Sequence, residues 1–245
     1  MTEGLVIVTG GSRGIGAAIC HRLAQDGYAV AVNYAARPEA ATAVVRDIAA
    51  AGGQAEAFEG DVSREADVEA LFAAAQDRFG RVVGLVNNAG ITGGMARLDE
   101  LALDVLNRTL AVNVVGTVLA SRAAVRAMST RHGGAGGVIV NLSSTAARLG
   151  APGEYVHYAA SKGAIDTLTV GLGREVAGEG IRVNAVAPGL IDTEMNSGER
   201  QARLAPTVPA KRVGAASEIA EAVAWLFSPG ASYVMGTVLT VGGGR

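Results

Sequence analysis

Short apolar runs alternate with longer, Ala-rich segments of helical period along the whole chain. Seven runs have the length and composition of strands: Leu5–Thr9, Ala29–Asn33, Ala55–Glu59, Val82–Asn87, Gly137–Ser143, Arg182–Ala187 and Val238–Val241. Several lack polar alternation, as strands covered on both faces do. Helices are predicted between them, near residues 15–26, 38–51, 64–79, 99–131, 156–178 and 217–227. This alternation predicts the α/β class: a single doubly wound domain over residues 1–245, with a mainly parallel seven-stranded sheet and helices on both faces.

Composition argues against several classes of protein. The 245 residues are 49% hydrophobic, which argues against disorder, and the net charge of −2 gives no electrostatic case for binding nucleic acid or an anionic membrane. The single Cys20 excludes an internal disulfide framework and is typical of a reducing compartment. The first apolar run is too short for a signal peptide. Polar residues interrupt the apolar stretch from Leu110 to Val125, which is predicted not to span a bilayer. We therefore expect a soluble cytoplasmic protein.

A glycine-rich turn follows the first predicted strand and precedes a helix: Thr9-Gly10-Gly11-Ser12-Arg13-Gly14-Ile15-Gly16. Glycines at 10, 14 and 16 allow a tight turn and remove Cβ atoms where a diphosphate must approach the backbone. Backbone N–H groups at the start of the helix then face the anion. The position within a βαβ unit favours a dinucleotide site over an ordinary tight turn.

Polar strings follow two further strands. Asn87-Asn88-Ala89-Gly90 comes after the fourth strand, and Pro188-Gly189-Leu190-Ile191-Asp192-Thr193 comes after the sixth. Carboxyl ends of parallel strands form the ligand crevice of open α/β sheets, so these strings are expected to line it with the glycine turn. Asn88 offers amide groups to a ribose or to backbone, and Asp61 is a candidate for the adenine end. A capping or turn role is the alternative for each.

Tyr158 and Lys162 stand four residues apart in a predicted helix, which places both side chains on one face. The chain has five tyrosines but only two lysines, so chance is a poor explanation of the spacing. A free tyrosine has a pKa of about 10, and a neighbouring ammonium lowers it by favouring phenolate. The pair therefore indicates a proton donor and acceptor.

The longest irregular stretch runs from about Asp192 to Gly214 and contains Pro206 and Pro209. Long loops inside compact domains are commonly functional, so residues 192–214 are predicted to form a substrate loop, with a flexible surface insertion as the alternative. The three histidines and the single cysteine show no metal-ligand spacing, and no metal site is predicted.

Taken in order, the motifs resemble those of the short-chain dehydrogenase/reductase family over the whole chain. They are the Thr9–Gly16 turn, Asp61-Val62, Asn87–Gly90, Asn113, Ser143-Ser144, Tyr158 with Lys162, and Pro188-Gly189. Within that family, the sequence resembles the branch that contains bacterial 3-oxoacyl-carrier-protein reductases and glucose dehydrogenases. The resemblance implies a Rossmann fold and hydride transfer between a nicotinamide cofactor and a small-molecule carbonyl or secondary alcohol. A non-catalytic dinucleotide-binding sensor or scaffold is the first alternative, and an epimerase or dehydratase is the second.

The resemblance also implies roles for four residues. Tyr158 is the general acid in reduction and the base in oxidation, and Lys162 depresses its pKa and holds the nicotinamide ribose. Ser144 hydrogen-bonds the substrate, since it stands where the family's serine does, in preference to Ser143. Asn113 is expected to hold a water that links Lys162 to solvent.

The preferred cofactor is predicted to be NADP(H), with NAD(H) possible. The second strand ends Val32-Asn33-Tyr34-Ala35-Ala36-Arg37, without the acid that binds a ribose 2′-OH in NAD sites. Arg13 and Arg37 are placed to bind a 2′-phosphate, whereas in the alternative reading Asn33 holds the 2′-OH of NAD. The residues predicted to contact the cofactor are Gly10, Ser12, Arg13, Gly14, Ile15, Gly16, Asn33, Tyr34, Ala35, Arg37, Asp61, Val62, Asn88, Ala89, Gly90, Tyr158, Lys162, Pro188, Gly189, Ile191 and Thr193.

Two further residues near Tyr158 are candidates from the sequence. Tyr155 is interpreted as a pocket wall or surface residue, and His157 is not expected to act as acid or base.

The helices predicted at 99–131 and 156–178 are apolar around much of their circumference, which predicts burial between chains in a homotetramer. The C-terminal segment from Tyr233 is the candidate for the other interface.

Overall fold

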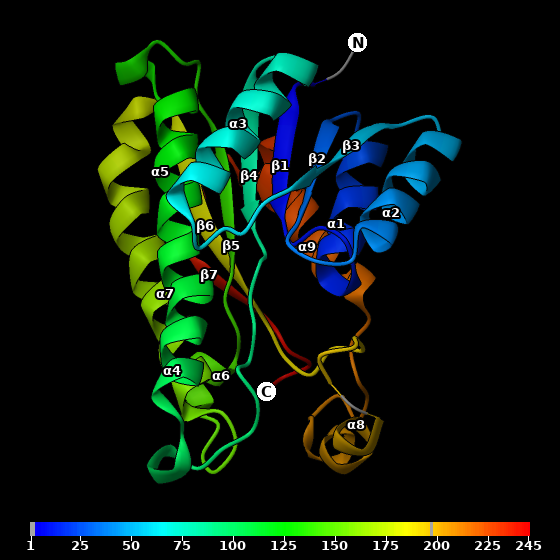
Figure 1. Ribbon diagram of the computed structural model, residues 1–245, viewed down its shortest axis with the longest axis vertical. Helices are drawn as coiled ribbons and strands as arrows, with labels where there is room; N and C mark the ends of the chain where they lie inside the picture. Colours follow the sequence, from blue (N-terminus) through cyan, green and yellow to red (C-terminus); the bar gives the residue numbers. More distant parts are fainter. Residues whose placement is uncertain (1–2, 197) are drawn as a thin grey trace.

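A single sheet of seven parallel strands organises the chain in the computed structural model, which describes residues 3–196 and 198–245 (Figure 1). The strands are β1 (Leu5–Thr9), β2 (Ala29–Tyr34), β3 (Gln54–Glu59), β4 (Val82–Asn87), β5 (Gly137–Leu142), β6 (Ile181–Pro188) and β7 (Val238–Val241). Their order is β3-β2-β1-β4-β5-β6-β7, and every neighbouring pair is parallel. The predicted α/β fold class is confirmed.

Helices cover both faces of this sheet, and alternate strand residues serve the two layers. On β1, Val6 and Val8 enter one core while Leu5 and Ile7 enter the other, and all four are fully buried. The first core is closed by α1 (Gly14–Gln25), α2 (Pro38–Ala50) and α9 (Ala216–Phe227). The second is closed by α3 (Glu65–Phe79), α5 (Gly116–Met128) and α7 (Val156–Val176) (Figure 1). Burial on both faces explains why the strand sequences lack polar alternation.

The helix predicted near residues 99–131 is present as one helical run, Leu103–Met128, which contains a π-helical turn that was not predicted. It consists of α4 (Leu103–Leu110), a π-helical turn at Ala111–Val115, and α5. At the junction Gly116 lies against Val62 so closely that a Cβ on the glycine would be 2.7 Å from the valine Cγ2 atom. A π-helical turn widens a helix locally and is frequent at functional sites.

Two short helices were not expected from the sequence. One is α6 (Ala146–Leu149), and the other is α8 (Gly198–Leu204), which lies inside the segment predicted to be irregular. Ser197, also in that segment, is outside the described residues. A helix of seven residues is too short to produce a recognisable period and depends on tertiary contacts.

The helical run Leu103–Met128 is, by length and composition, long and apolar enough to cross a membrane, with a mean hydropathy of 1.3. The polar residues within Leu110–Val125 therefore do not exclude a span, contrary to the sequence prediction. In the structure α5 packs on β4, and 39% of the most apolar window is buried inside the protein. The same properties are found in core helices of soluble proteins.

Candidate active site

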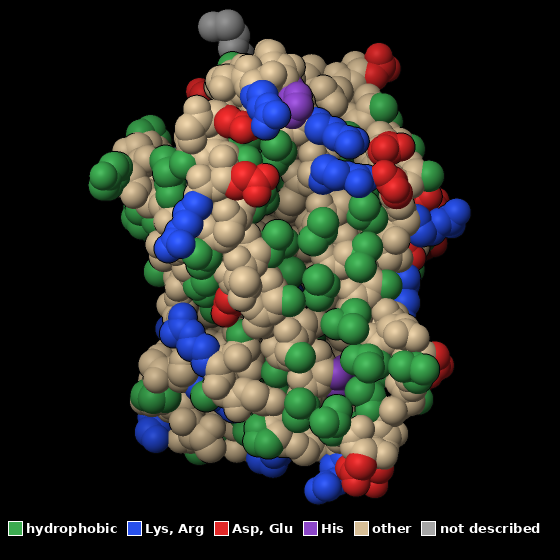
Figure 2. Space-filling view, turned by 90° about the vertical axis from the view of Figure 1, so that its left-hand side faces the viewer, with side chains coloured by type: hydrophobic (Ala, Val, Ile, Leu, Met, Phe, Trp, Pro, Cys, Tyr) green, Lys and Arg blue, Asp and Glu red, His purple; other side chains and the backbone are tan. Residues whose placement is uncertain are grey.

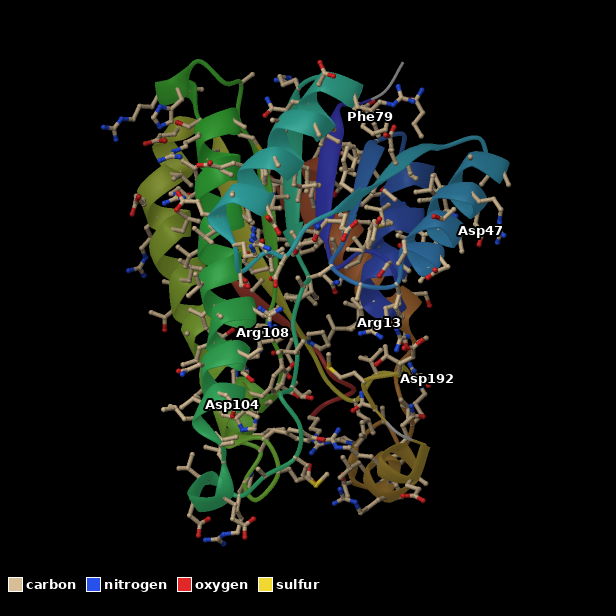
Figure 3. All side chains as sticks on the ribbon, viewed as in Figure 1. Arg13, Asp47, Phe79, Asp104, Arg108 and Asp192 are labelled. Atoms are coloured by element: carbon tan, nitrogen blue, oxygen red, sulfur yellow. The ribbon has the colours of Figure 1, made fainter. Side chains whose placement is uncertain are left out.

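A cleft of about 670 Å³ opens at the carboxyl ends of the strands. It lies between β1 and β4, where the order of the strands in the sheet changes direction. Ligands of doubly wound sheets bind at this switch point. Figure 3 shows Arg13 and Asp192 on one side of the cleft and Arg108 on the other. Residues predicted to contact the cofactor form most of its lining: Gly10, Ser12, Arg13, Gly14, Ile15, Gly16, Asn33, Tyr34, Ala35, Arg37, Asp61, Val62, Asn88, Ala89, Gly90 and Thr193.

The glycine turn can approach a ligand because Gly10, Gly14 and Gly16 carry no Cβ atoms, and the fold leaves no room or no suitable backbone for them. Gly10 and Gly14 have φ angles of +62° and +52°, a backbone region that favours glycine. A Cβ on Gly16 would lie 2.3 Å from the Gly10 carbonyl oxygen and 2.5 Å from Nδ2 of Asn88. The exposed start of α1 is thus left free to face an anion.

Asn88 and Thr9 join this turn to the end of β4. Nδ2 of Asn88 donates to the carbonyl oxygens of Thr9 and Gly10, at 3.1 and 2.8 Å. The Thr9 hydroxyl oxygen accepts from the backbone N–H groups of Asn88 and Ala89, each at 3.1 Å. Asn88 therefore binds backbone, one of the two options left by the sequence. The side chain of Thr9 was not predicted to matter, because its partners are 79 and 80 residues away.

Asn33 is buried beneath the cleft, and its carboxamide is occupied by backbone. Its Oδ1 atom accepts from Gly10 N–H at 3.3 Å, and Nδ2 donates to the carbonyl oxygens of Phe58 and Gly60, at 3.3 and 3.0 Å. With 2% of its surface exposed, Asn33 holds the turn on β2 and β3. This geometry argues against the alternative in which Asn33 binds the ribose 2′-OH of NAD.

Arg13 and Arg37 lie together at one end of the cleft, as expected, but they are joined by an acid. Both guanidinium groups donate to the same Oε2 atom of Glu194, Arg13 at 3.0 Å and Arg37 at 2.8 Å. The second strand itself ends without an acid, but the fold brings Glu194 to this end of the cleft. Sequence spacing could not reveal this acid, because Glu194 is 181 and 157 residues from its partners.

Asp61, the candidate for the adenine end, lines the same cleft with Arg108 opposite. Its Oδ2 atom accepts from Nη2 of Arg108 at 2.8 Å, and its Oδ1 atom accepts from the backbone N–H of Ser63 at 3.0 Å. One carboxylate oxygen therefore fixes the turn into α3, while the other positions an arginine from α4.

A second cavity of about 320 Å³ adjoins the first and contains the predicted chemical groups. Ser144, Tyr158 and Lys162 line it together with Pro188, Gly189 and Ile191. Ile15, Asn88, Gly90, Thr92, Thr193 and Met195 line both cavities. The two spaces are thus one continuous site, with the glycine turn at one end and Ser144, Tyr158 and Lys162 at the other.

Lys162 is 5% exposed and anchored by backbone. Its Nζ atom donates to the Leu142 carbonyl oxygen at 2.6 Å and lies 5.7 Å from the Tyr158 ring centroid. Burial lowers the pKa of Lys162 to about 8, and the carboxylate of Asp166 acts in the opposite direction. In this chain a neutral amine is therefore accessible close to physiological pH.

The pKa of Tyr158 differs in direction from the sequence prediction. Burial raises it above the ordinary value, and this outweighs the lowering by the hydrogen bond with Ser144 and by the charge of Arg200. In the unliganded chain the pKa of Tyr158 is not lowered as expected from the ammonium of Lys162, because desolvation of the phenol dominates.

The two adjacent serines point to different surroundings. Ser144 lies beside the phenol of Tyr158, and its Oγ atom accepts from Ala146 N–H at 3.1 Å. Ser143 also lines the second cavity, but its hydroxyl donates to the carboxylate of Asp166, four residues beyond Lys162 on α7. Both serines directly follow β5, and their hydroxyl groups meet different partners. The choice of Ser144 as the serine that binds the substrate stays a prediction.

Asn113 is fully buried in the π-helical turn, and it is not among the described residues that line either cavity. Its Oδ1 atom accepts from Ile91 N–H at 2.8 Å, and Nδ2 donates to the Ile91 carbonyl at 2.9 Å and to Ser161 Oγ at 3.0 Å. Protein groups thus bind both ends of the carboxamide, and the expected water-holding role stays a prediction. Asn113 instead fixes the segment after β4 against α7.

An ion-pair cluster lies in the wall of the second cavity, and it was not predicted. Oε2 of Glu154 accepts from Arg200 at 3.1 Å, and Oε1 accepts from Arg203 at 2.6 Å. Arg200 also lies over the ring of Tyr155, 5.3 Å from its centroid, so Tyr155 is a cavity wall. The cluster ties α8 to the segment before α7. His157 is buried, and its Nε2 atom lies 2.7 Å from the Thr92 carbonyl oxygen.

Comparisons with known proteins extend these observations. The profile of the enoyl-(acyl carrier protein) reductase family matches residues 10–245. An uncharacterized oxidoreductase of Escherichia coli (strain K12) is 50% identical over 98% of this chain and 99% of its own. Glucose 1-dehydrogenase 2 of Bacillus subtilis (strain 168) is 39% identical over 100% of this chain and 95% of its own.

Solved structures agree with the sequence matches. A short-chain dehydrogenase from Burkholderia cenocepacia in complex with NADP has a TM-score of 0.92 and 38% identity, over 99% of this chain and 98% of its own. A 7α-hydroxysteroid dehydrogenase complexed with NADH has a TM-score of 0.92 and 34% identity, over 99% of this chain and 94% of its own.

Proposed function

The chain belongs to the short-chain dehydrogenase/reductase family of oxidoreductases, and on that premise we propose that it transfers a hydride reversibly between NADP(H) and a carbonyl or secondary alcohol. The proposal rests on one observation, which is that the cleft and the second cavity are continuous. A glycine-lined cleft with paired arginines continues into a cavity lined by Ser144, Tyr158 and Lys162. A cofactor bound along the cleft would supply the hydride, and the cavity would supply the proton.

Each group in the cavity has a defined task in this proposal. The phenol of Tyr158 gives its proton to the carbonyl oxygen during reduction and removes it from the hydroxyl during oxidation. Ser144, beside that phenol, donates a hydrogen bond to the same substrate oxygen and orients it. Lys162 adds positive charge as phenolate forms, and Asn113 positions the loop that faces Lys162.

Preference for NADP(H) over NAD(H) is supported by charge and by occupied hydrogen bonds. Arg13 and Arg37 offer two guanidinium groups at the cleft end, and guanidinium binds phosphate by paired, charge-assisted hydrogen bonds. Asn33, the candidate ligand of a free 2′-OH, is occupied by backbone. The glycine turn and Asp61 would hold the diphosphate and the adenosine between them.

The site also constrains the substrate. The second cavity has apolar walls formed by Leu149, Pro152, Met195 and Leu204, with the Glu154–Arg200 pair also in its lining. An amphipathic carbonyl compound suits this lining. The sequence suggested two specific activities, reduction of a 3-oxoacyl thioester and oxidation of a sugar. Their substrates would place very different groups against these apolar walls.

Assembly as a homotetramer is a further part of the proposal. Leu103, Leu110, Val115 and Val118 on α4, the π-helical turn and α5 are exposed by 68, 37, 47 and 42%. Figure 2 shows this side of the molecule, where hydrophobic side chains gather over the middle and charged ones lie mainly towards the edges. A second copy would bury such a face. A cytoplasmic location accords with the single, buried, free Cys20.

The test is oxidation of NADPH and NADH, followed by absorbance, with a panel of ketones, aldehydes, a 3-oxoacyl thioester and, in reverse, sugars. We expect turnover with at least one substrate and a higher kcat/KM with NADPH. Tight NADPH binding without turnover on any substrate would favour the sensor or scaffold alternative instead.

A further inference from the structure

The carboxylate of Glu194 lies where two positive charges converge at the end of the cofactor cleft. One oxygen atom, Oε2, accepts hydrogen bonds from Arg37 at 2.8 Å and from Arg13 at 3.0 Å. These two arginines are the same groups that the proposed function assigns to the 2′-phosphate of NADP(H). Both partners hold the pKa of Glu194 below its ordinary value, Arg37 most strongly, so the carboxylate is ionised at neutral pH.

Arg37 is held in position by an uncommon backbone conformation. Its φ and ψ angles are +62° and +66°, in the left-handed region, at the residue that precedes α2. Residues other than glycine rarely adopt this backbone region, and those that do are concentrated at ligand sites. The direction of the Arg37 side chain is therefore set by the fold as well as by Glu194.

The segment that carries Glu194 also borders both cavities. Its neighbours Thr193 and Met195 line both the cofactor cleft and the cavity with Tyr158. Thr193 lies against the glycine turn, since a Cβ on Gly14 would be 3.3 Å from its Cγ2 atom. The pairs with Arg13 and Arg37 thus hold the start of the predicted substrate loop across the cofactor site.

We propose that Glu194 is a cofactor-selectivity residue that occupies the 2′-phosphate position of the empty enzyme and is displaced only by a phosphorylated cofactor. This inference rests on the proposed use of NADP(H). A phosphate group carries more negative charge and more acceptor oxygens than a carboxylate, so it replaces Glu194 on the arginine pair. NAD(H), which has no 2′-phosphate, leaves Glu194 in place and the loop segment fixed.

The test uses nucleotide fragments, because they reach the arginines without the nicotinamide. Binding of adenosine 2′,5′-bisphosphate and of 5′-AMP is measured by calorimetry for the wild type, Glu194→Gln and Glu199→Gln. The glutamine keeps the size of the side chain and removes its charge. Glu199 is the matched control, an exposed carboxylate on α8 of the same loop.

We expect Glu194→Gln to bind the bisphosphate about 3- to 10-fold more tightly than the wild type, which corresponds to loss of an exposed charge pair. Binding of 5′-AMP should stay unchanged in all three proteins, and Glu199→Gln should match the wild type. Hydrogen exchange of residues 192–196 in the wild type should rise with the bisphosphate and not with 5′-AMP.

Three outcomes would count against the inference, and they distinguish its failure from the failure of its premise. If the wild type prefers the bisphosphate but Glu194→Gln binds it no more tightly, the role of Glu194 is refuted and NADP(H) use stands. If the wild type binds both fragments equally and Arg37→Ala changes neither, both proposals fall together. An equal gain for both fragments in Glu194→Gln would also refute displacement by the phosphate.

Discussion

The Nζ atom of Lys162 lies 5.7 Å from the centroid of the Tyr158 ring, one helical turn away on α7. The ammonium group donates to the Leu142 carbonyl oxygen at 2.6 Å, so the end of β5 fixes it rather than the phenol. Because backbone holds Lys162, the phenol oxygen of Tyr158 remains available to Ser144 and to a substrate.

Tyr158→Phe should abolish turnover and leave cofactor binding intact. Phenylalanine fills the same space in the cavity but has no proton to exchange, and acid–base groups of this kind contribute about 10²–10⁴-fold to rate. Steady-state kcat and the Kd for NADPH measure the two effects separately. Tyr155→Phe, on the neighbouring cavity wall, serves as the control and should retain activity. More than about a tenth of wild-type kcat in Tyr158→Phe would remove Tyr158 from the mechanism.

Lys162 should make the stability of the unliganded protein rise between about pH 8 and pH 10.5. Its folded pKa is about 8 and its ordinary value is 10.5, so in this window the unfolded chain binds the proton that the folded chain has released. Stability then increases with pH, by up to about 3 kcal/mol for a shift of this size. Below pH 8 both states are protonated and the effect levels off at its least favourable value.

Urea unfolding at several pH values, compared between the wild type and Lys162→Met, isolates this contribution. The variant should lose the rise, whereas Lys211→Met, which removes the other lysine from an exposed position, should keep it. Because the chain has only two lysines, NMR of labelled lysine gives the Lys162 titration directly. A midpoint near 10.5 would contradict the prediction.

Gly16→Ala should disrupt the glycine turn. Its new methyl group would lie 2.3 Å from the Gly10 carbonyl oxygen and 2.5 Å from Nδ2 of Asn88, so backbone must move. We expect a loss of about 1–3 kcal/mol in the free energy of unfolding and a large loss of cofactor affinity. Gly171→Ala on α7, where no heavy atom lies within 4 Å of the added methyl, should instead gain about 0.5–1 kcal/mol. Equal stability of both variants would be incompatible with the observed packing.

Glu154→Gln should loosen α8 without changing the chemistry. The carboxylate of Glu154 accepts from both Arg203 and Arg200, and these partners keep its pKa below the ordinary value despite partial burial. The ion pairs therefore stabilise above the ordinary glutamate pKa and weaken as pH falls through the lower folded value. We expect faster hydrogen exchange in Gly198–Leu204 and a higher KM with kcat nearly unchanged. Glu199→Gln is the charge-matched control, and unchanged exchange in Glu154→Gln would contradict the role.

Val118→Glu should separate the chains of the proposed tetramer. Val118 is 42% exposed on α5, and a charge there cannot be buried against a second copy without a partner. Light scattering should give about four times 24.7 kDa for the wild type and a smaller assembly for the variant. Ala49→Glu adds the same charge at an exposed position of α2 and should leave the mass unchanged. A monomeric wild type at micromolar concentration would refute the tetramer.

Local sequence was sufficient for much of the fold and of the chemistry. Runs such as Leu5–Thr9 without polar alternation are typical of strands buried on both faces, and their alternation with helical segments indicates a parallel sheet between two helical layers. The glycines between Thr9 and Gly16 and the spacing of Tyr158 and Lys162 are also local patterns, legible without any tertiary contact.

Tertiary structure alone decided the features that depend on partners distant in sequence. The π-helical turn at Asn113 accompanies the close contact of Gly116 with Val62, which no helical period reveals. The upward pKa shift of Tyr158 comes from desolvation by the assembled fold. Glu194 meets Arg13 across 181 residues, so the acid that the second strand lacks is supplied by another part of the chain. Sequence spacing predicts contacts along one element, whereas burial and charge at a site depend on every element that folds around it.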